Sequence, residues 1–290
     1  MNGDKGGNTI MRHEPYRARK IFENTWVIDI GAVCFCYLLV GEEKALVIDT
    51  GMGKGNLREY LETITDKPMM VVNTHGHGDH TLWNGAFDEV YMHHNAIADV
   101  YNGDNSSTRE RMGVDVPDYK PIGIDEGYVF ELGGRQVKVF HTPCHSPGDL
   151  MFIDTTKRLL FTGDNLEVGQ VLIFYGNDKI GGTVKRHHDI LKKMEEHYDE
   201  FDFICPAHNG SPIHKSVLKD FIENDERILS GIEGTAELPS PSFNINMFLP
   251  NEERRAFVRC SEWKNTWLVY DVRRVFESEG LYYTSSGEEM

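Results

Sequence analysis

Seven side chains that can bind metal ions follow one another in order along this chain of 290 residues, and they constrain its fold more than any other feature. Four lie in the short run THGHGDH, and the other three are spread over the next 130 residues. The apolar pair Val71 and Val72 predicts a strand that ends at the turn residues Asn73 and Thr74, directly before the first four. A fold that uses the whole series must therefore bring several strand ends to one edge. The seven residues are His75, His77, Asp79, His80, His145, Asp164 and His208.

The residue types in this series predict an open, catalytic metal site. His75 and His77 are two residues apart, so in an extended or tightly turned segment both imidazoles project to the same side and can reach one ion. Neutral imidazole and carboxylate suit Zn, Fe or Mn, and the series lacks cysteine, which closed structural zinc sites favour. Seven ligands are enough for two adjacent divalent ions.

The series divides into two ligand sets that share a carboxylate. We expect three nitrogens at the first ion, from His75, His77 and His145, and a second set made of Asp79, His80 and His208. Asp164 is expected to bridge the two ions, because a carboxylate between two cations is a natural bridge.

At this point the chain resembles the metallo-β-lactamase superfamily of hydrolases. The resemblance rests on the HxHxDH run, the segment HTPCHSPG around His145, FTGD around Asp164 and PAHNG around His208, and it covers about residues 20 to 230. It implies an α/β (α+β) fold, a four-layer αββα sandwich with the metals at one edge. It also implies that Asp49, in LVIDTG, orients a metal ligand from below the site.

The apolar patterns predict the elements of such a sandwich. Strands are expected at residues 25–30, 33–40, 45–48, 71–72, 89–92, 129–132, 136–141, 150–153, 158–161, 203–205 and 267–270. Helices are expected around 57–64, 94–101, 183–198 and 217–232. Residues 103–127 are expected to form a long polar connection.

Composition shifts near residue 236, at the linker-like segment GTAELPSPS. We therefore expect a metallo-β-lactamase-like catalytic domain over 1–235 and a small C-terminal appendage over 236–290. Every metal ligand precedes this boundary, and the later segment carries Trp263 and Trp267. The appendage is expected to shape substrate access or a subunit contact, and a homodimer is left open.

Net charge indicates which partners the chain can bind, and cysteine content indicates its cellular compartment. The chain has 30 basic and 46 acidic residues, a net charge of −16, so a nucleic acid would be repelled and a small-molecule substrate is expected. No run reaches transmembrane length, and the first residues lack the apolar segment of a signal peptide. The five cysteines are odd in number and scattered, as in a reducing compartment. We expect a cytoplasmic protein without a membrane partner.

The predicted reaction is hydrolysis. A hydroxide held between two metal ions, zinc in first place with iron or manganese as alternatives, would attack an ester, thioester or lactone-type acyl bond. Asp79 would be both a ligand and a proton acceptor, and Tyr175 an oxyanion donor. Four further histidines, His93, His94, His187 and His188, receive no role here, because histidines at helix starts and strand ends are more often solvated than catalytic.

Other activities of the superfamily stay open. Iron-dependent persulfide dioxygenases use two histidines and one aspartate, here His75, His145 and Asp164. Phosphodiesterases share the dinuclear ligands, and a metal-binding protein without catalysis is a third alternative. Asp149 stands where glyoxalase II relatives carry a histidine, which argues against that particular enzyme. Cys144 precedes a ligand, and a small packing residue is the favoured interpretation.

Overall fold

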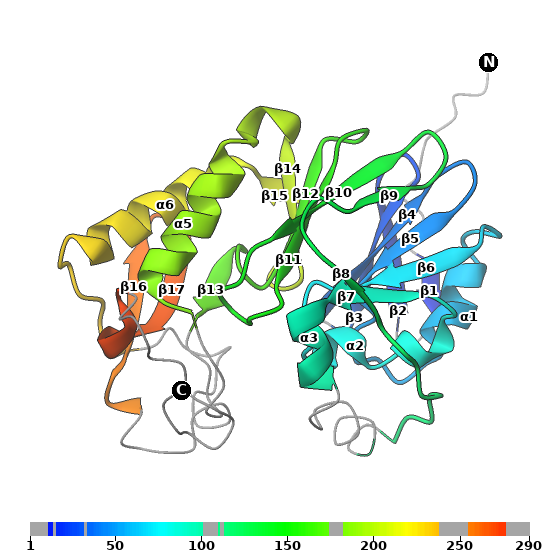
Figure 1. Ribbon diagram of the computed structural model, residues 1–290, viewed down its shortest axis with the longest axis horizontal. Coiled ribbons are helices and arrows are strands. Elements are labelled where there is room, and N and C mark those ends of the chain that lie inside the picture. The colour runs from blue at the N-terminus through cyan, green and yellow to red at the C-terminus, as the bar shows by residue number, and fades with distance from the viewer. Residues whose placement is uncertain are drawn as a thin grey trace.

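Two β-sheets face each other in the computed structural model, and helices cover their outer sides (Figure 1). The structure describes residues 11–13, 16–31, 34–100, 110, 113–173, 182–237 and 255–276. Within these ranges no helix is long and apolar enough to cross a lipid bilayer.

The first sheet has eight strands in chain order. The neighbours from β1 to β5 are antiparallel, whereas those from β5 to β8 are parallel. Parallel neighbours need a crossover, and α1 (Leu57–Glu62) provides it between β5 and β6. The strands are β1 (Met11–His13), β2 (Tyr16–Phe22), β3 (Thr25–Ile30), β4 (Cys34–Val40), β5 (Ala45–Ile48), β6 (Met69–Val72), β7 (Val90–His93) and β8 (Ile122–Ile124).

The second sheet has six strands in the order β15-β14-β12-β11-β10-β9. Gly133 and Gly134 both adopt positive φ, 80° and 67°, in the turn that joins β9 to β10, and glycine populates this region without steric cost. β12 and β14 run parallel, with α5 (Val184–Glu195) in the connection. The strands are β9 (Val129–Glu131), β10 (Gln136–His141), β11 (Leu150–Asp154), β12 (Leu159–Gly163), β14 (Phe203–Pro206) and β15 (Ile213–His214).

Three apolar layers hold the sandwich together. Between the sheets, Leu39 and Ile48 of the first pack in one core with Phe152 and Phe161 of the second. Outside the first sheet, α1 packs through Leu57, Tyr60 and Leu61. Outside the second sheet, α5 packs together with α6 (Ser216–Leu229), through Leu191, Met194 and Phe221. This is the expected four-layer αββα arrangement.

The C-terminal residues add a third, smaller sheet. β16 (Val258–Trp263) and β17 (Thr266–Asp271) form a hairpin, and β17 pairs in parallel with β13 (Gly169–Leu172), which lies between the predicted ligands Asp164 and His208 in the chain. Leu268 and Tyr270 are buried in the same core as α5 and α6. The division at residue 235 stays a prediction; what the structure shows is that this hairpin packs against α6 and β13.

Several predicted elements differ from the structure. The THGHGDH run is not extended throughout, because α2 (Gly78–Thr81) begins within it. The short α3 (His94–Asp99) begins where expected, and its predicted last residue lies outside the described residues. β8 lies inside the connection expected to be polar loop. The strands β1, β2, β8, β13, β15 and β16 were not expected. Each pairs at its sheet position despite a mixed or short apolar pattern, because tertiary context outweighs local propensity.

Candidate metal centre

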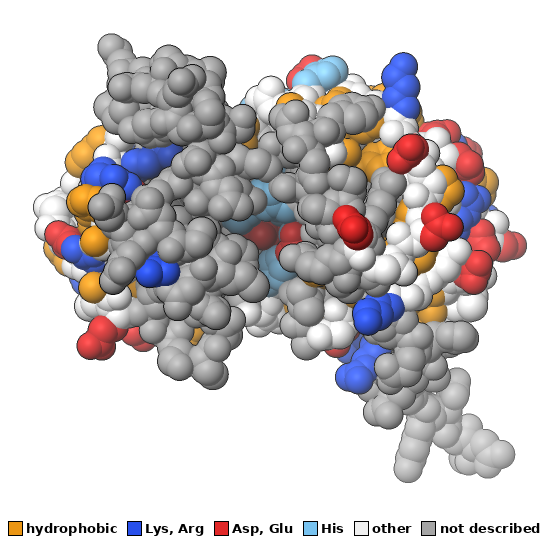
Figure 2. Space-filling model, turned by 90° about the horizontal axis from the view of Figure 1, so that it is seen from below, with side chains coloured by type: hydrophobic (Ala, Val, Ile, Leu, Met, Phe, Trp, Pro, Cys, Tyr) orange, Lys and Arg blue, Asp and Glu red, His pale blue; other side chains and the backbone are white. Residues whose placement is uncertain are grey.

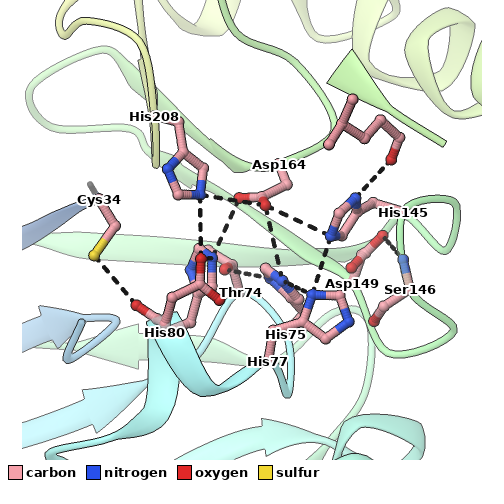
Figure 3. A network of polar contacts seen from close by, with 12 residues as sticks. Cys34, Thr74, His75, His77, His80, His145, Ser146, Asp149, Asp164 and His208 are labelled. Atoms are coloured by element: carbon pink, nitrogen blue, oxygen red, sulfur yellow. Dashed lines mark hydrogen bonds and ion pairs between the residues drawn. The ribbon is translucent and has the colours of Figure 1, made fainter. Parts of the chain in front are cut away.

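Strand ends gather the seven predicted ligands at one edge of the sandwich. The loop after β6 and the start of α2 carry four of them, and the others lie in the segment between β10 and β11, just after β12 and just after β14. Figure 3 shows the labelled imidazoles and the Asp164 carboxylate pointing toward one another from these different elements. On the molecular surface, pale-blue imidazoles and red carboxylates lie in a hollow near the middle of one face (Figure 2).

Three imidazoles form the first group. Nε2 of His75 lies 2.9 Å from Nδ1 of His77, and Nε2 of His145 lies 3.1 Å from the same atom. Burial, followed by the neighbouring imidazoles, lowers the pKa of His75 and of His77 well below the ordinary value. Both rings are therefore neutral at pH 7 and offer lone pairs to a cation. The three side chains can hold one ion together.

A carboxylate and two imidazoles form the second group. Oδ2 of Asp79 lies 3.5 Å from Nε2 of His80 and 3.7 Å from Nε2 of His208. Ligand atoms around a tetrahedral zinc ion are about 3.4 Å apart. Burial would raise the pKa of Asp79, but the two imidazoles hold it well below its usual range. Burial would lower the pKa of His208, but Asp164 and Glu167 raise it to about 10. A metal ion bound here would therefore displace a proton.

Asp164 contacts both groups. Its Oδ2 lies 3.5 Å from Nε2 of His145 and 3.4 Å from Nε2 of His208, while its Oδ1 lies 3.4 Å from Nε2 of His80. Oδ2 of this carboxylate thus faces a nitrogen of the first group. Both of its oxygens face nitrogens of the second group. This is the position that a bridging ligand needs.

Two buried atoms at this point test whether a metal fits. Nε2 of His80 and Oδ1 of Asp164 are buried and make no hydrogen bond. Leaving such groups unsatisfied costs free energy, and the cost is greater for a charged group. A divalent cation between them would satisfy both, so the residues present fit a metal site.

Asp49 orients the second group from below, as the sequence led us to expect. Its Oδ2 lies 3.0 Å from Nδ1 of His80 and accepts a hydrogen bond from Oγ1 of Thr74 at 2.7 Å, while its Oδ1 accepts one from the Thr74 amide at 2.8 Å. Oγ1 of Thr74 in turn lies 3.1 Å from Nδ1 of His75. Asp49 therefore fixes imidazole rings of both groups.

A second set of hydrogen bonds fixes the loop that carries His145. Oδ2 of Asp149 accepts from the amides of Cys144 and Ser146 and from Nδ2 of Asn165, at 3.2, 2.7 and 3.0 Å. Oδ1 of Asn165 accepts from the amide of His145 at 2.9 Å. The ring of His145 is set by the carbonyl of Leu172, 2.7 Å from its Nδ1. Asp149 and Asn165 thus support the ligand through its backbone.

Several other residues singled out in the sequence lie elsewhere. Tyr175 is outside the described residues, and its role stays a prediction. Cys144 is 2% exposed and packs in the apolar core with α5 and α6, in line with a packing role. His187 is not solvated: it is fully buried, and His93 is 6% exposed and stacks on His141. His188 is partly buried, and only His94 among these four is exposed.

Sequence reasoning also missed a buried carboxyl group beside the second ligand set. Glu167 is 4% exposed, and its Oε1 accepts a hydrogen bond from Nδ2 of Asn209 at 3.1 Å, next to His208. Burial raises the pKa of Glu167 to about 8, although His208 opposes this. No short motif marks this residue, because the contact joins positions 42 apart.

Comparisons with known proteins agree with this architecture. The sequence model of the Metallo-beta-lactamase superfamily matches residues 30–208. The human acyl-coenzyme A thioesterase MBLAC2 is 28% identical over 203 residues, which cover 57% of this chain and 73% of that protein. An atrochrysone carboxyl ACP thioesterase from Emericella nidulans is 29% identical over 186 residues, 63% of this chain and 51% of that protein.

Solved structures show the same fold at low sequence identity. A metallo-beta-lactamase from Pontibacter korlensis superposes with a TM-score of 0.54 at 17% identity, covering 73% of this chain and 99% of the other. The superfamily protein ST1585 from Sulfolobus tokodaii superposes with a TM-score of 0.51, also at 17% identity, over 74% and 86% of the two chains.

Proposed function

Because this chain belongs to the metallo-beta-lactamase superfamily, we propose that it is a metal-dependent hydrolase that cleaves thioesters, in the class of acyl-coenzyme A or acyl-carrier-protein substrates. One observation carries the proposal: Asp164 faces two groups of metal-binding side chains at once, with an unsatisfied buried oxygen between them. The thioester class is supported by two relatives whose names give thioesterase activity on acyl-coenzyme A and on an acyl carrier protein.

The seven predicted ligands are the contribution of the chain to metal-dependent hydrolysis. Two divalent ions held by these groups would supply a water of lowered pKa and a Lewis acid for a carbonyl oxygen. His75 and His77 are neutral and buried, so their lone pairs need no deprotonation before metal binding. All seven donors are nitrogen or oxygen, which keeps zinc first and iron or manganese as alternatives.

We propose that Asp79, besides being a ligand, contacts the attacking water. The side chain of Asp79 is 33% exposed, more than that of either imidazole it faces. His208 is 19% exposed, and His80 is fully buried. The two facing imidazoles keep the carboxylate ionised at neutral pH. An ionised carboxylate at the open side of the site can accept a hydrogen bond from the attacking water and orient it, whereas the lowered pKa makes this carboxylate a weak base.

Metal analysis followed by a substrate screen tests this function. The purified chain, loaded with zinc, should contain about two ions and should hydrolyse an acyl-coenzyme A under strict exclusion of oxygen. Ester, lactone and phosphodiester reporters measured beside it define the substrate class. His208→Ala should lower turnover strongly, whereas His214→Ala, which changes an exposed histidine bonded to Ser216, should not.

The same screen separates the competing functions. A persulfide dioxygenase would use iron at His75, His145 and Asp164 and would consume oxygen. Oxygen uptake with a persulfide and no turnover of any acyl reporter would contradict hydrolysis. Turnover of the phosphodiester alone would move the assignment to a phosphodiesterase, and metal binding without any turnover would leave a binding protein.

A further inference from the structure

His187 is a fully buried histidine on α5 that contacts α6 on one side and the residue after Asp164 on the other. It lies in the first turn of α5, and its Nδ1 is 2.8 Å from Oδ2 of Asp225 on α6. Its Nε2 is 2.8 Å from the backbone carbonyl oxygen of Asn165. The side chains of His187 and Asp225 are both 0% exposed.

The two partners of this imidazole fix its protons. A carbonyl oxygen can only accept, so Nε2 must carry a hydrogen and donate it to Asn165. The short contact to Asp225 then needs a second proton between Nδ1 and Oδ2, because a lone pair on Nδ1 would face a carboxylate lone pair. Burial alone would lower the pKa of His187, but the facing Asp225 and the Asn165 carbonyl raise it. The pair therefore keeps its proton at neutral pH.

Stability alone is a weak reason to bury such a pair. Removing two charged groups from water costs several kcal/mol, and well-packed apolar residues often replace a buried pair without loss. Oδ1 of Asp225 is buried without a hydrogen bond, which adds to the cost. Among the described residues, the hydrogen bond that these two side chains make beyond each other is the one to Asn165, and the ring of His187 also lies edge-on to Phe221.

Asn165 leads directly to the metal ligands. It follows Asp164 in sequence, and its side chain accepts from the amide of His145 at 2.9 Å. The same side chain donates to the carbonyl of Thr142 at 2.9 Å and to Oδ2 of Asp149 at 3.0 Å. A shift of the Asn165 backbone would therefore move the bridging carboxylate and the loop of His145 together.

We infer that His187 is a positioning residue for the metal centre: its Nε2–H fixes the backbone of Asn165 and so the placement of Asp164 and His145. The inference rests on the proposed metal-dependent function, since it assigns His187 to the support of that site. Neither His187 nor Asp225 belongs to the two ligand groups.

Two matched substitutions of His187 separate positioning from simple packing. The amide nitrogen of glutamine can take the place of Nε2, so His187→Gln keeps a donor for the Asn165 carbonyl and loses the bond to Asp225. The amide nitrogen of asparagine can take the place of Nδ1, so His187→Asn keeps the bond to Asp225 and loses the one to Asn165. Cobalt affinity and the visible absorption spectrum of the cobalt-loaded chain are measured for both, beside unfolding of the metal-free proteins in denaturant.

The inference predicts that the two variants bind cobalt differently even though their stabilities toward denaturant are similar. His187→Gln should retain the wild-type cobalt spectrum and affinity within about threefold, whereas His187→Asn should change the spectrum and weaken affinity by about tenfold or more, the usual cost of losing an outer hydrogen bond at a metal site. Equal effects of the two variants on cobalt binding, or effects that follow unfolding stability alone, would overturn it. If the wild-type protein binds cobalt but cleaves no thioester, the proposed substrate is refuted. The cobalt binding of the two His187 variants then still tests the positioning role.

Discussion

The carboxylate of Asp49 lies 3.0 Å from Nδ1 of His80, so the ring that offers Nε2 to the second ligand set is held from its opposite side. Asp49 itself sits at φ 60°, a left-handed conformation that is uncommon outside glycine, directly after β5. The strand end thus places the carboxylate, and the carboxylate places the ring.

Removing this support should weaken metal binding without removing a ligand. Asp49→Ala is expected to lower metal affinity about 10- to 100-fold, because the ring of His80 and the hydroxyl of Thr74 both lose an acceptor. Competition with a chelator of known affinity measures the change. Asp88→Ala is the matched control, since its side chain is 85% exposed and pairs with Arg58. Equal affinities for the Asp49 variant and the wild type would contradict the assigned role.

The chain should bind two metal ions, and the two ligand sets should empty differently. Asp164→Ala is expected to lower occupancy of both sites, because its carboxylate faces both groups. His208→Ala should mainly empty the second site. Elemental analysis after metal repletion measures the occupancy. A ceiling of one ion per wild-type chain would refute the dinuclear arrangement and favour a mononuclear iron site.

Asp149 should make stability depend on pH. Burial raises its pKa to about 6, above the value of about 3.9 in an unfolded chain. The folded state thus favours the protonated form, and this stabilisation is fully present below about pH 4 and is lost as pH rises through about 6. The shift corresponds to about 3 kcal/mol.

Asp149→Asn stays neutral at every pH and should lack this dependence. Between pH 4 and 7, the free energy of unfolding of the metal-free variant should rise relative to wild type by about 3 kcal/mol, because only the wild type must then bury a charge. Denaturant unfolding at several pH values measures the difference. Parallel curves for the two proteins would show that the carboxyl group is already ionised at pH 4.

The buried pair of Arg135 and Asp154 should be important for stability. The guanidinium is 3% exposed and the carboxylate is fully buried, with Nε to Oδ2 at 2.8 Å. Asp154→Ala is expected to cost about 3 to 5 kcal/mol, because it leaves the guanidinium buried without its counter-charge. Asp202→Ala, which breaks the exposed pair with Arg158, should change stability little. Similar losses for the two variants would contradict the importance of burial.

The C-terminal hairpin should stabilise the metal-binding part of the chain. Leu268 is fully buried in the core of α5 and α6, so Leu268→Ala should cost about 2 to 5 kcal/mol. Ile232→Ala, at a residue that is 47% exposed, is the control. Deleting residues 236–290 should destabilise the remaining chain, because β13 loses its partner strand. Unchanged unfolding of the truncated protein would show instead that the segment is a separate appendage.

Much of the fold and the ligand series could be read from the sequence. The strands β3, β5 and β10 begin and end where the apolar runs predict, and the seven predicted ligands lie together in space. These features are local: a strand needs a short apolar run, and a ligand at its end needs only the correct residue type. The less regular strands escaped prediction, since β2 alternates basic and apolar residues and β13 carries a glycine and a glutamine.

The sequence by itself determined which side chains can bind metal and that they follow strand ends, because residue type and apolar spacing are written in neighbouring positions. Only the tertiary structure decided what holds those ligands in place. His187 meets Asp225 across 38 positions and Asn165 across 22, and Asp49 meets His80 across 31. Such contacts follow no local period, because the packing of helices and strands alone brings these residues together and removes water from around them.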